Sequence, residues 1–138
     1  MTDVLELNLK AKPTSKLAEY VPQNVEPLFC KIDFVGSTFT CTPPPTDTDT
    51  DILCLVASKE HIISVLGALL TQGWEIDGDY GLSSHFTSYR KGNINLIVTK
   101  APEFYELFIK ARDVCKLLNI MDKKLRCKIH KIIMKEIE

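Results

Sequence analysis

Hydrophobic and polar residues follow one another in patterns that predict several strands after residue 28. Phe29 to Val35 is typical of a strand, and the continuous apolar run from Asp51 to Ala57 is typical of a strand buried on both faces. Trp74 to Asp77 predicts a short strand whose tryptophan belongs to the core. Residues 85–91 and 94–99 predict two paired strands joined by a tight turn.

Three segments carry apolar residues at the spacing of one helix face. The first helix is expected to begin after Ser58, a suitable N-cap, and to end before Gly73, which suits the C′ position. Two further helices are expected within residues 102–137, separated by Asn119 to Asp122, whose last residue caps the second. The expected buried stripes are Ile62, Ile63, Leu66, Leu69 and Leu70; Phe104, Phe108, Ala111, Cys115 and Leu118; and Leu125, Ile129, Ile132 and Ile133.

The patterns are weaker in two segments. Residues 5–9 alternate in polarity as a strand does, and residues 13–20 predict a short helix that ends before Pro22. Residues 38–48 are expected to form a loop, because three consecutive prolines cannot lie in a central strand.

This order of elements predicts an α/β fold, with a small mixed β-sheet, helices packed on it and a helical C-terminal segment. A length of 138 residues favours a single domain over residues 1–138, with its core over about 29–100 and its C-terminal helices over about 102–137. Hydrophobic residues make up 45% and charged residues 25%, which excludes a mainly disordered or collagen-like chain.

Charge and cysteine content narrow the class of protein further. Seventeen basic and eighteen acidic residues give a net charge of −1, so the whole molecule is not a polybasic nucleic-acid binder. The five cysteines are odd in number and lack metal-ligand spacing, and we interpret them mostly as small core residues in a reducing compartment. No apolar run approaches the ~20 residues of a membrane span. We therefore expect a cytoplasmic protein with no membrane partner.

An alternating acidic tract is the most informative feature of the sequence. In an extended strand Asp47, Asp49 and Asp51 point the same way, and their mutual repulsion is relieved by a divalent cation such as Mg²⁺ or Mn²⁺. The alternative is a solvated loop without a ligand. A calcium EF-hand is disfavoured because Ile52 and Ser58 stand where that loop needs glycine and glutamate.

The context of this tract resembles a known signature. Val35-Gly36-Ser37 ends an apolar strand, eleven residues intervene, and Asp49-Thr50-Asp51-Ile52 then begins another. This spacing resembles the nucleotidyltransferase-fold superfamily, which includes polymerase beta-like and minimal nucleotidyltransferases, over roughly residues 29–100. The segment from Phe86 to Thr99, with Phe104 and Tyr105, also resembles small phage-encoded proteins described as nucleotidyltransferases.

The resemblance implies a fold of nucleotidyltransferase type and a set of site residues. Gly36 and Ser37 would hold the triphosphate of an NTP, the glycine by letting the backbone approach and the serine through its hydroxyl and N–H. Asp49 and Asp51 would bind one or two Mg²⁺ or Mn²⁺ ions. Arg90 and Lys91, in the predicted hairpin, are candidates to reach phosphates, with solvated turn cations as the alternative.

One position departs from the pattern of the superfamily. Active members carry a third acid on a later strand, and by element order this chain has Asn95 there, with Asn93 as the neighbour in phase. An amide brings no charge and accepts no proton at neutral pH. Either Asp47 or Asp79 supplies a substitute carboxylate, or the protein binds a nucleotide or a partner without catalysis.

These observations support three hypotheses about function. The first is a metal-dependent nucleotidyltransferase that moves a nucleoside monophosphate from an NTP to a hydroxyl acceptor on a small molecule, a protein or RNA. The second is a catalytically degenerate relative that binds a nucleotide or a host protein, which would suit a phage origin. The third is a structural α/β domain whose acidic loop has no ligand. A homodimer or a partner protein is expected to complete the acceptor site.

Two secondary features have both a functional and a structural interpretation. His85 is a candidate for the rim of the site, and no histidine is assigned to a metal. The last helix carries six basic residues, which can contact RNA or DNA phosphates but more commonly form a solvated face opposite a core stripe. The basic residues are Lys123, Lys124, Arg126, Lys128, Lys131 and Lys135.

Overall fold

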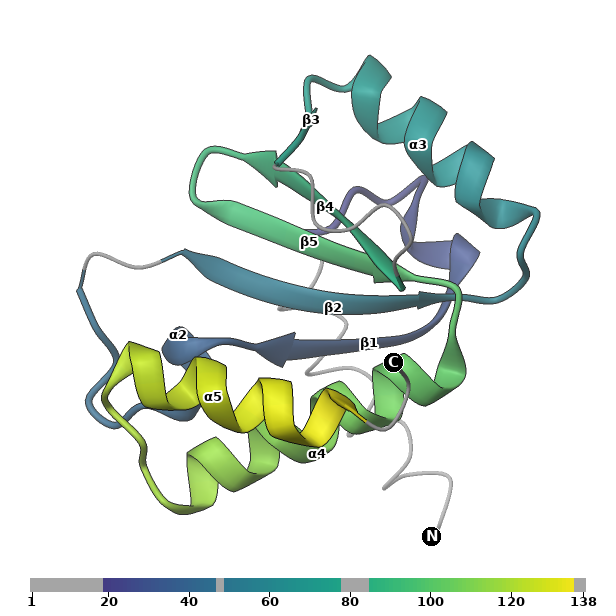
Figure 1. The fold of residues 1–138 in the computed structure, drawn as a ribbon. Helices are drawn as coiled ribbons and strands as arrows, with labels where there is room; N and C mark the ends of the chain where they lie inside the picture. Colours follow the sequence, from purple (N-terminus) through teal and green to yellow (C-terminus); the bar gives the residue numbers. More distant parts are fainter. Residues whose placement is uncertain (1–18, 47–48, 78–84, 136–138) are drawn as a thin grey trace, which may run out of the picture.

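A five-stranded mixed sheet forms the centre of the molecule (Figure 1). The structure is a computed structural model that describes residues 19–46, 49–77 and 85–135. The strands are β1 (Phe29–Val35), β2 (Thr50–Val56), β3 (Glu75–Ile76), β4 (Phe86–Lys91) and β5 (Ile94–Thr99), and they lie in the order β1-β2-β5-β4-β3. The helices are a 3-10 turn η1 (Glu26–Leu28), a short α2 (Ser37–Thr40), α3 (His61–Thr71), α4 (Pro102–Leu117) and α5 (Lys123–Met134).

The strands pair in antiparallel fashion except at the centre of the sheet. β1 and β2 are antiparallel, as are β5 with β4 and β4 with β3. β2 and β5 are parallel, and residues 57–93 connect them with α3, β3 and β4 on the way. Because β2 and β5 run in the same direction, both begin at the edge of the sheet where β1 ends (Figure 1).

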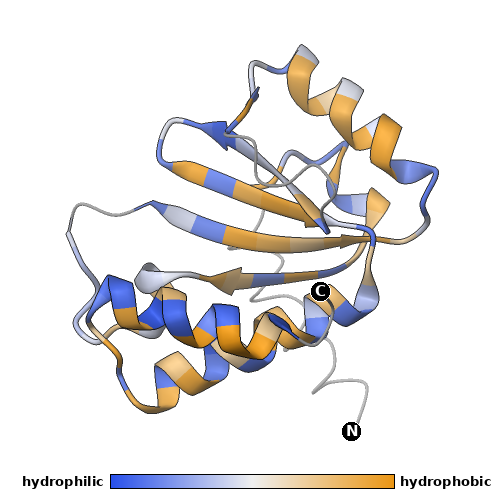
Figure 2. Cartoon of the chain, in the orientation of Figure 1, coloured by the Kyte–Doolittle hydropathy of each residue, from blue (hydrophilic) through white to orange (hydrophobic). Residues whose placement is uncertain are grey.

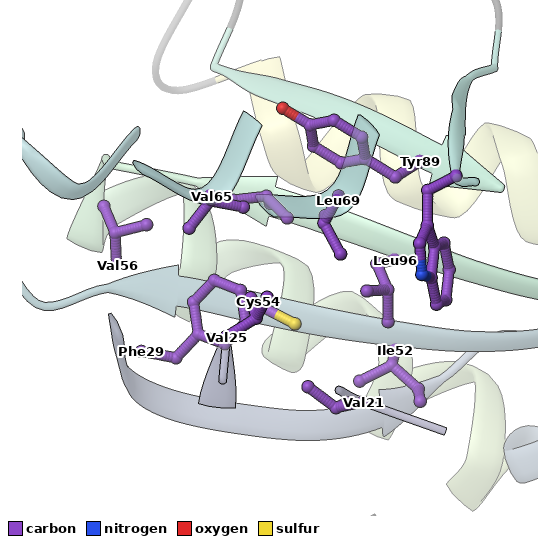
Figure 3. Close-up of a cluster of buried hydrophobic side chains, with 12 residues drawn as sticks. Val21, Val25, Phe29, Ile52, Cys54, Val56, Val65, Leu69, Tyr89 and Leu96 are labelled. Carbon is purple, nitrogen blue, oxygen red and sulfur yellow. The ribbon is translucent and has the colours of Figure 1, made fainter. Parts of the chain in front are cut away.

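Helices cover both faces of the sheet, which explains the uninterrupted apolar run of β2. Alternate residues of β2 point to opposite faces: Ile52 and Cys54 pack toward α3, and Leu53 and Leu55 pack toward α4. Figure 3 shows the cluster on the α3 side, in which Val65 and Leu69 of α3 meet β2 and β5. The buried members of that cluster are Val21, Val25, Phe29, Ile52, Cys54, Val56, Val65, Leu69, Trp74, Tyr89, Leu96 and Val98.

The strand predictions agree with the structure to within a residue or two, and so does the turn between β4 and β5. Gly92 in that turn has a φ of +62°, and Gly73 after α3 has a φ of +90°, which glycine adopts without a steric penalty. The expected core position of Trp74 is confirmed, because only 4% of the residue is exposed. Asp122 caps α5 as predicted, accepting a hydrogen bond from the backbone N–H of Lys124 at 3.1 Å.

Two details of the predicted secondary structure are wrong. Residues 38–48 contain the end of α2, because the backbone N–H groups of Thr40 and Cys41 bond back to Gly36 and Ser37 instead of leaving an open loop. The first long helix begins at His61, since residues 58–60 form a turn before it.

The facing of the helices also differs from the expected stripes. In α3, Val65 is buried, whereas Ile63 is 76% exposed and Leu70 is 47% exposed. At the end of α4, Leu118 is exposed, and in α5 Leu125 and Ile132 are exposed. α5 packs mainly on α4 and reaches the core cluster beside the sheet through Met134, so only one side of it finds apolar neighbours (Figure 1).

The remaining expectations have mixed outcomes. Cys41, Cys54 and Cys115 are buried as predicted, whereas Cys30 and Cys127 are exposed. The strand expected at 5–9 and most of the helix expected at 13–20 lie outside the described residues. Within the described ranges, no helix combines the length and the apolar character needed to cross a membrane.

Candidate functional site

Three polar side chains form a row across the middle of the sheet. Asp51 of β2 lies opposite Asn95 of β5 in the parallel register, and Asn95 lies opposite Arg90 of β4 in the antiparallel register. All three alternate in phase with residues that face α4, so they share one face of the sheet. The Asn95 amide Nδ2 donates a hydrogen bond to Asp51 Oδ1 at 3.3 Å. The row therefore combines a carboxylate, an amide and a guanidinium from three neighbouring strands.

The turn after β1 closes against the carboxylate of this row. Gly36 has a φ of +78°, and a Cβ placed on it would lie 2.2 Å from Asp51 Oδ2. Only glycine fits both the backbone conformation and the space. Ser37 follows directly as the first residue of α2, so the glycine–serine turn and Asp51 are in contact at the edge where β2 begins.

Asp49 enters the site just before β2 begins. The Thr38 hydroxyl donates to the backbone oxygen of Asp49 at 2.8 Å, which ties α2 to this residue. Arg90 Nη1 lies 2.8 Å from Asp49 Oδ2, and Arg90 Nε lies 2.8 Å from Asp77 Oδ2. Arg90 thus bridges two carboxylates from opposite sides, and these hydrogen bonds raise its pKa.

The electrostatics of Asp51 differ from those of an ordinary surface aspartate. Burial raises its pKa from 3.8 to about 6, and the nearby negative charge of Asp49 acts in the same direction. The hydrogen bond from Asn95 and the positive charges of Arg90 and Lys123 lower the pKa but do not offset the burial. The Asp51 carboxylate is thus largely removed from water, and the positive charges around it do not fully stabilise its ionised form.

The hairpin of α4 and α5 holds the α2 segment in place through polar contacts. Asn119, at the turn between the two helices, exchanges hydrogen bonds with the backbone of Thr42, at 2.9 and 3.1 Å. Lys116 Nζ donates to the Phe39 oxygen at 3.0 Å, and Arg126 Nη1 lies 3.3 Å from Cys41 Sγ. These contacts hold the segment after Ser37 and bring the start of α5 beside the site.

The structure brings most of the predicted site residues together and separates two of them. Gly36, Ser37, Asp49, Asp51, Asn95 and Arg90 gather at one edge of the sheet. Lys91 points to the other face, where its Nζ donates to the Gln72 oxygen at 2.9 Å at the end of α3. Lys91 therefore lies on the face of the sheet away from Asp51, because consecutive strand residues face opposite ways.

His85 also lies away from the site. It precedes β4 at the end opposite Arg90, roughly 16 Å away at the rise of a strand. Its ring stacks on Phe104 with centroids 5.8 Å apart. Asp47 and Asp79, the proposed substitutes for the third acid, lie outside the described residues.

Two charged residues of the site were not found from the sequence. Asp77 follows the two-residue strand β3, and its role is set by the β3–β4 pairing that carries it to Arg90. Lys123 begins α5 and acts electrostatically on Asp51 across 72 positions of sequence. Only Asp77 had a usable signal in the sequence, because it is an acid that follows a predicted strand next to the predicted hairpin of Arg90.

The side chains of this edge include oxygen donors of the kind that a hard divalent cation prefers. Asn95 Oδ1 is buried and has no hydrogen-bond partner among the described residues, and it stands beside the Asp51 carboxylate. Two carboxylates and an amide oxygen suit Mg²⁺, which takes few protein ligands and completes its shell with water and phosphates. Within the described ranges no group of three or more His, Cys, Asp or Glu residues is arranged to hold a metal ion, and Arg90 neutralises Asp49.

The sheet order, the glycine–serine turn after β1 and the acids at the start of β2 define an α/β protein with a fold of nucleotidyltransferase type. The chain is similar to the crystal structure of the conserved protein GrpB from Enterococcus faecalis, with a TM-score of 0.58 and 16% identity, covering 95% of this chain and 93% of that chain. At this identity the similarity shows the fold alone, and it confirms the predicted fold class. The sequence matches neither a family model nor a curated protein.

Proposed function

We propose that this protein is a metal-dependent nucleotidyltransferase that moves a nucleoside monophosphate from an NTP to a hydroxyl acceptor. The observation that carries the proposal is the contact between the glycine–serine turn and Asp51, with Asn95 beside it in register. A turn that leaves no room for a Cβ places backbone and serine groups next to a desolvated carboxylate, which suits a phosphate and its cation together.

Each residue of the edge has a role in this proposal. Gly36 and Ser37 bind the triphosphate, and Asp49 and Asp51, with Asn95 Oδ1, hold Mg²⁺ or Mn²⁺, which neutralises phosphate charge when bound. Arg90 Nη1 exchanges its contact with Asp49 for a phosphate oxygen, while the ion pair between Arg90 Nε and Asp77 is retained. In the transfer, the acceptor oxygen bonds to the α-phosphorus, pyrophosphate leaves, and the hydroxyl proton passes to water.

Thermal unfolding with each NTP, with and without Mg²⁺ or Mn²⁺, tests this proposal. A ligand at a hundred times its dissociation constant adds about 2.7 kcal/mol to the free energy of unfolding. We expect a shift that needs both NTP and cation and that is lost in the Asp49→Asn/Asp51→Asn variant, each protein being compared with its own unliganded state. Glu103→Gln, an exposed acid on α4, is the matched control. No shift with any NTP in the wild type would contradict the proposal.

A second candidate function is nucleotide or partner binding without transfer. It is favoured by Asn95 at the position of the third acid and by Arg90, which already neutralises Asp49. The variant Asn95→Asp separates the two functions through pyrophosphate release in the presence of RNA, protein and small-molecule hydroxyl acceptors. A large gain over an inactive wild type would indicate a degraded site that binds only. Turnover in the wild type that falls in Asn95→Asp would indicate that asparagine is the working residue.

A further inference from the structure

We infer that the exposed face of α5 binds the phosphates of a single-stranded nucleic acid and leads its end toward the candidate site. The binding surface stands on the structure of α5 alone, and only the identification of this strand as the acceptor rests on the proposed function. The inference begins from a row of four lysines, here called the lysine row. It consists of Lys124, Lys128, Lys131 and Lys135.

The lysine row follows a single line along the helix. Spacings of four, three and four residues place these side chains within about 60° of one another around an axis with 3.6 residues per turn. All four residues are exposed. At a rise of 1.5 Å per residue the row extends over roughly 16 Å, with neighbouring lysines about 4.5–6 Å apart along the axis. A flexible anionic chain meets such a row with several phosphates at once.

The charge of the row has no ion-pair partner among the residues that the structure describes. α5 contains five basic residues and no acidic residue between Lys123 and Met134. Surface lysines on ordinary helices commonly alternate with acids that offset their charge. This helix therefore presents a positive face whose complement is a polyanion.

The opposite side of α5 fixes the row in place. The His130 ring packs edge-on against Phe108 of α4, with centroids 4.8 Å apart, and Met134 packs against the core cluster on the α4 side of the sheet. Arg126 Nη1 donates to the oxygens of Ile120 and Met121 at 3.0 and 2.8 Å, which anchors the first turn. Figure 2 shows hydrophilic segments recurring along α5 beside its apolar ones.

The lysine row begins in the helical turn that lies beside the candidate site. The first turn of α5 lies next to α2, as the contact between Arg126 and Cys41 shows, and Lys123 acts electrostatically on Asp51 (Figure 1). A strand lying along the row is thus directed at the edge of the sheet where β2 and β5 begin. A terminal hydroxyl on that strand would be the acceptor of the proposed transfer.

Two apolar residues beside the row favour a single strand over the other polyanions. Leu125 is 43% exposed and Ile132 is 71% exposed, and both lie on one flank of the lysines. They suit the ribose and base faces that a single strand leaves open and that a duplex stacks inside. A membrane-surface helix turns its whole apolar face to the lipid. Here Met134 and the half-buried Ile129 and Ile133 face the protein instead.

Fluorescence anisotropy with a labelled 20-nucleotide oligouridine RNA tests the inference. For single strands the logarithm of the binding constant falls with the logarithm of salt concentration by about 0.7 per phosphate contact, so four contacts predict a slope of about −3. The variant Lys128→Gln/Lys131→Gln/Lys135→Gln should reduce the magnitude of the slope by about 2 and weaken binding roughly ten-fold or more at low salt. The matched control removes three exposed lysines elsewhere, as Lys59→Gln/Lys100→Gln/Lys110→Gln.

Each outcome of this experiment decides the inference. RNA binding that is lost in the α5 variant and kept in the control supports it. Equal loss in both variants indicates non-specific attraction and overturns it, as does binding to vesicles of anionic phospholipid without binding to RNA. The NTP-dependent thermal shift is measured on the same three proteins. A normal shift without RNA binding contradicts only this inference, and RNA binding without a shift contradicts only the proposed function.

Discussion

At the scale of single residues, Gly36 and Asp51 determine the shape of the candidate site. The glycine is in the left-handed region of backbone conformation, and its Cα lies against the carboxylate of Asp51. The carboxylate in turn lies beside Asn95, so that three residues from separate strands and turns occupy one small volume. A substitution at Gly36 or Asn95 is therefore expected to shift the carboxylate of Asp51, which contacts both.

Gly36→Ala is expected to destabilise the protein and to abolish any response to NTP. The backbone strain of a positive φ costs about 1–3 kcal/mol, and the new Cβ would also displace Asp51. Urea denaturation measures the change in the free energy of unfolding. Gly67→Ala is the matched control, because a Cβ at Gly67 meets open space within α3 and should stabilise the helix by about 0.5–1 kcal/mol. Equal effects of the two substitutions would contradict the close contact.

Asp51→Asn is expected to stabilise the cation-free protein at neutral pH. Burial raises the pKa of Asp51 from 3.8 to about 6, so the folded state binds the proton more tightly than the unfolded state does. The stability that this proton gives is fully present below about pH 4 and is lost as the pH rises through 6. The difference corresponds to about 3 kcal/mol at pH 7–8.

The test of this prediction is the free energy of unfolding as a function of pH, measured without divalent cations. The stability gap between Asp51→Asn and the wild type should open between about pH 4 and pH 6. Asp113→Asn, an exposed carboxylate on α4, should show no such opening. A gap that stays constant over this range would rule out the raised pKa of Asp51.

At the scale of elements, the strands were predictable from local sequence and the faces of the helices only in part. Phe104, Ala111 and Cys115 of α4 are buried as predicted, whereas the predicted stripes of α3 and α5 include exposed residues. β2 is an unbroken apolar run and β4–β5 has a glycine turn, and both signals are contained within a few residues. The face that a helix buries depends on what packs against it. α3 buries Val65 and Leu69 against the sheet, and neither periodicity nor composition distinguished Leu69 from its exposed neighbour Leu70.

Two neighbouring leucines of α3 test its observed orientation. Leu69 is fully buried, so Leu69→Ala should cost about 2–5 kcal/mol in the free energy of unfolding. Leu70 is 47% exposed, and Leu70→Ala should change it by no more than about 0.5 kcal/mol. Chemical denaturation of both variants measures the contrast. Similar losses for the two substitutions would mean that the helix is rotated relative to the structure.

The candidate site itself was predictable only in part, for a related reason. The glycine–serine turn and Asp49-Thr50-Asp51 are close enough in sequence to form a motif, and Asn95 followed from the order of strands. The separation of Arg90 from Lys91 depends on which residue of β4 lies opposite Asn95, and this register is a property of the assembled sheet. The contributions of Asp77 and Lys123 require contacts between segments that are distant in the chain.

At the scale of the whole molecule, the C-terminal hairpin is attached to the site by polar contacts as well as by packing. Asn119 and Lys116 bond to the backbone of Thr42 and Phe39. Arg126 Nη1 adds a contact to Cys41 Sγ, 85 positions earlier, and also bonds to the Ile120 and Met121 oxygens within the hairpin. Arg126→Met keeps the length of the side chain but leaves these acceptors without their donor. We expect a loss of about 1–3 kcal/mol in the free energy of unfolding.

Lys128→Met, on the exposed side of the same helix, is the control for Arg126 and should change stability by no more than about 0.5 kcal/mol. Urea denaturation compares the two variants. If Arg126→Met were as stable as the control, the contacts of Arg126 would add nothing measurable to the attachment of α5.

The parallel pairing of β2 with β5 has a consequence for how the molecule folds. It joins two locally connected units, the β1–β2 pair and the β3–β4–β5 meander, and the cross-strand row has Asp51 on one unit with Asn95 and Arg90 on the other. Neither unit alone contains a complete binding site. A ligand of this edge therefore recognises only chains in which the two units have docked, and its binding would report that docking.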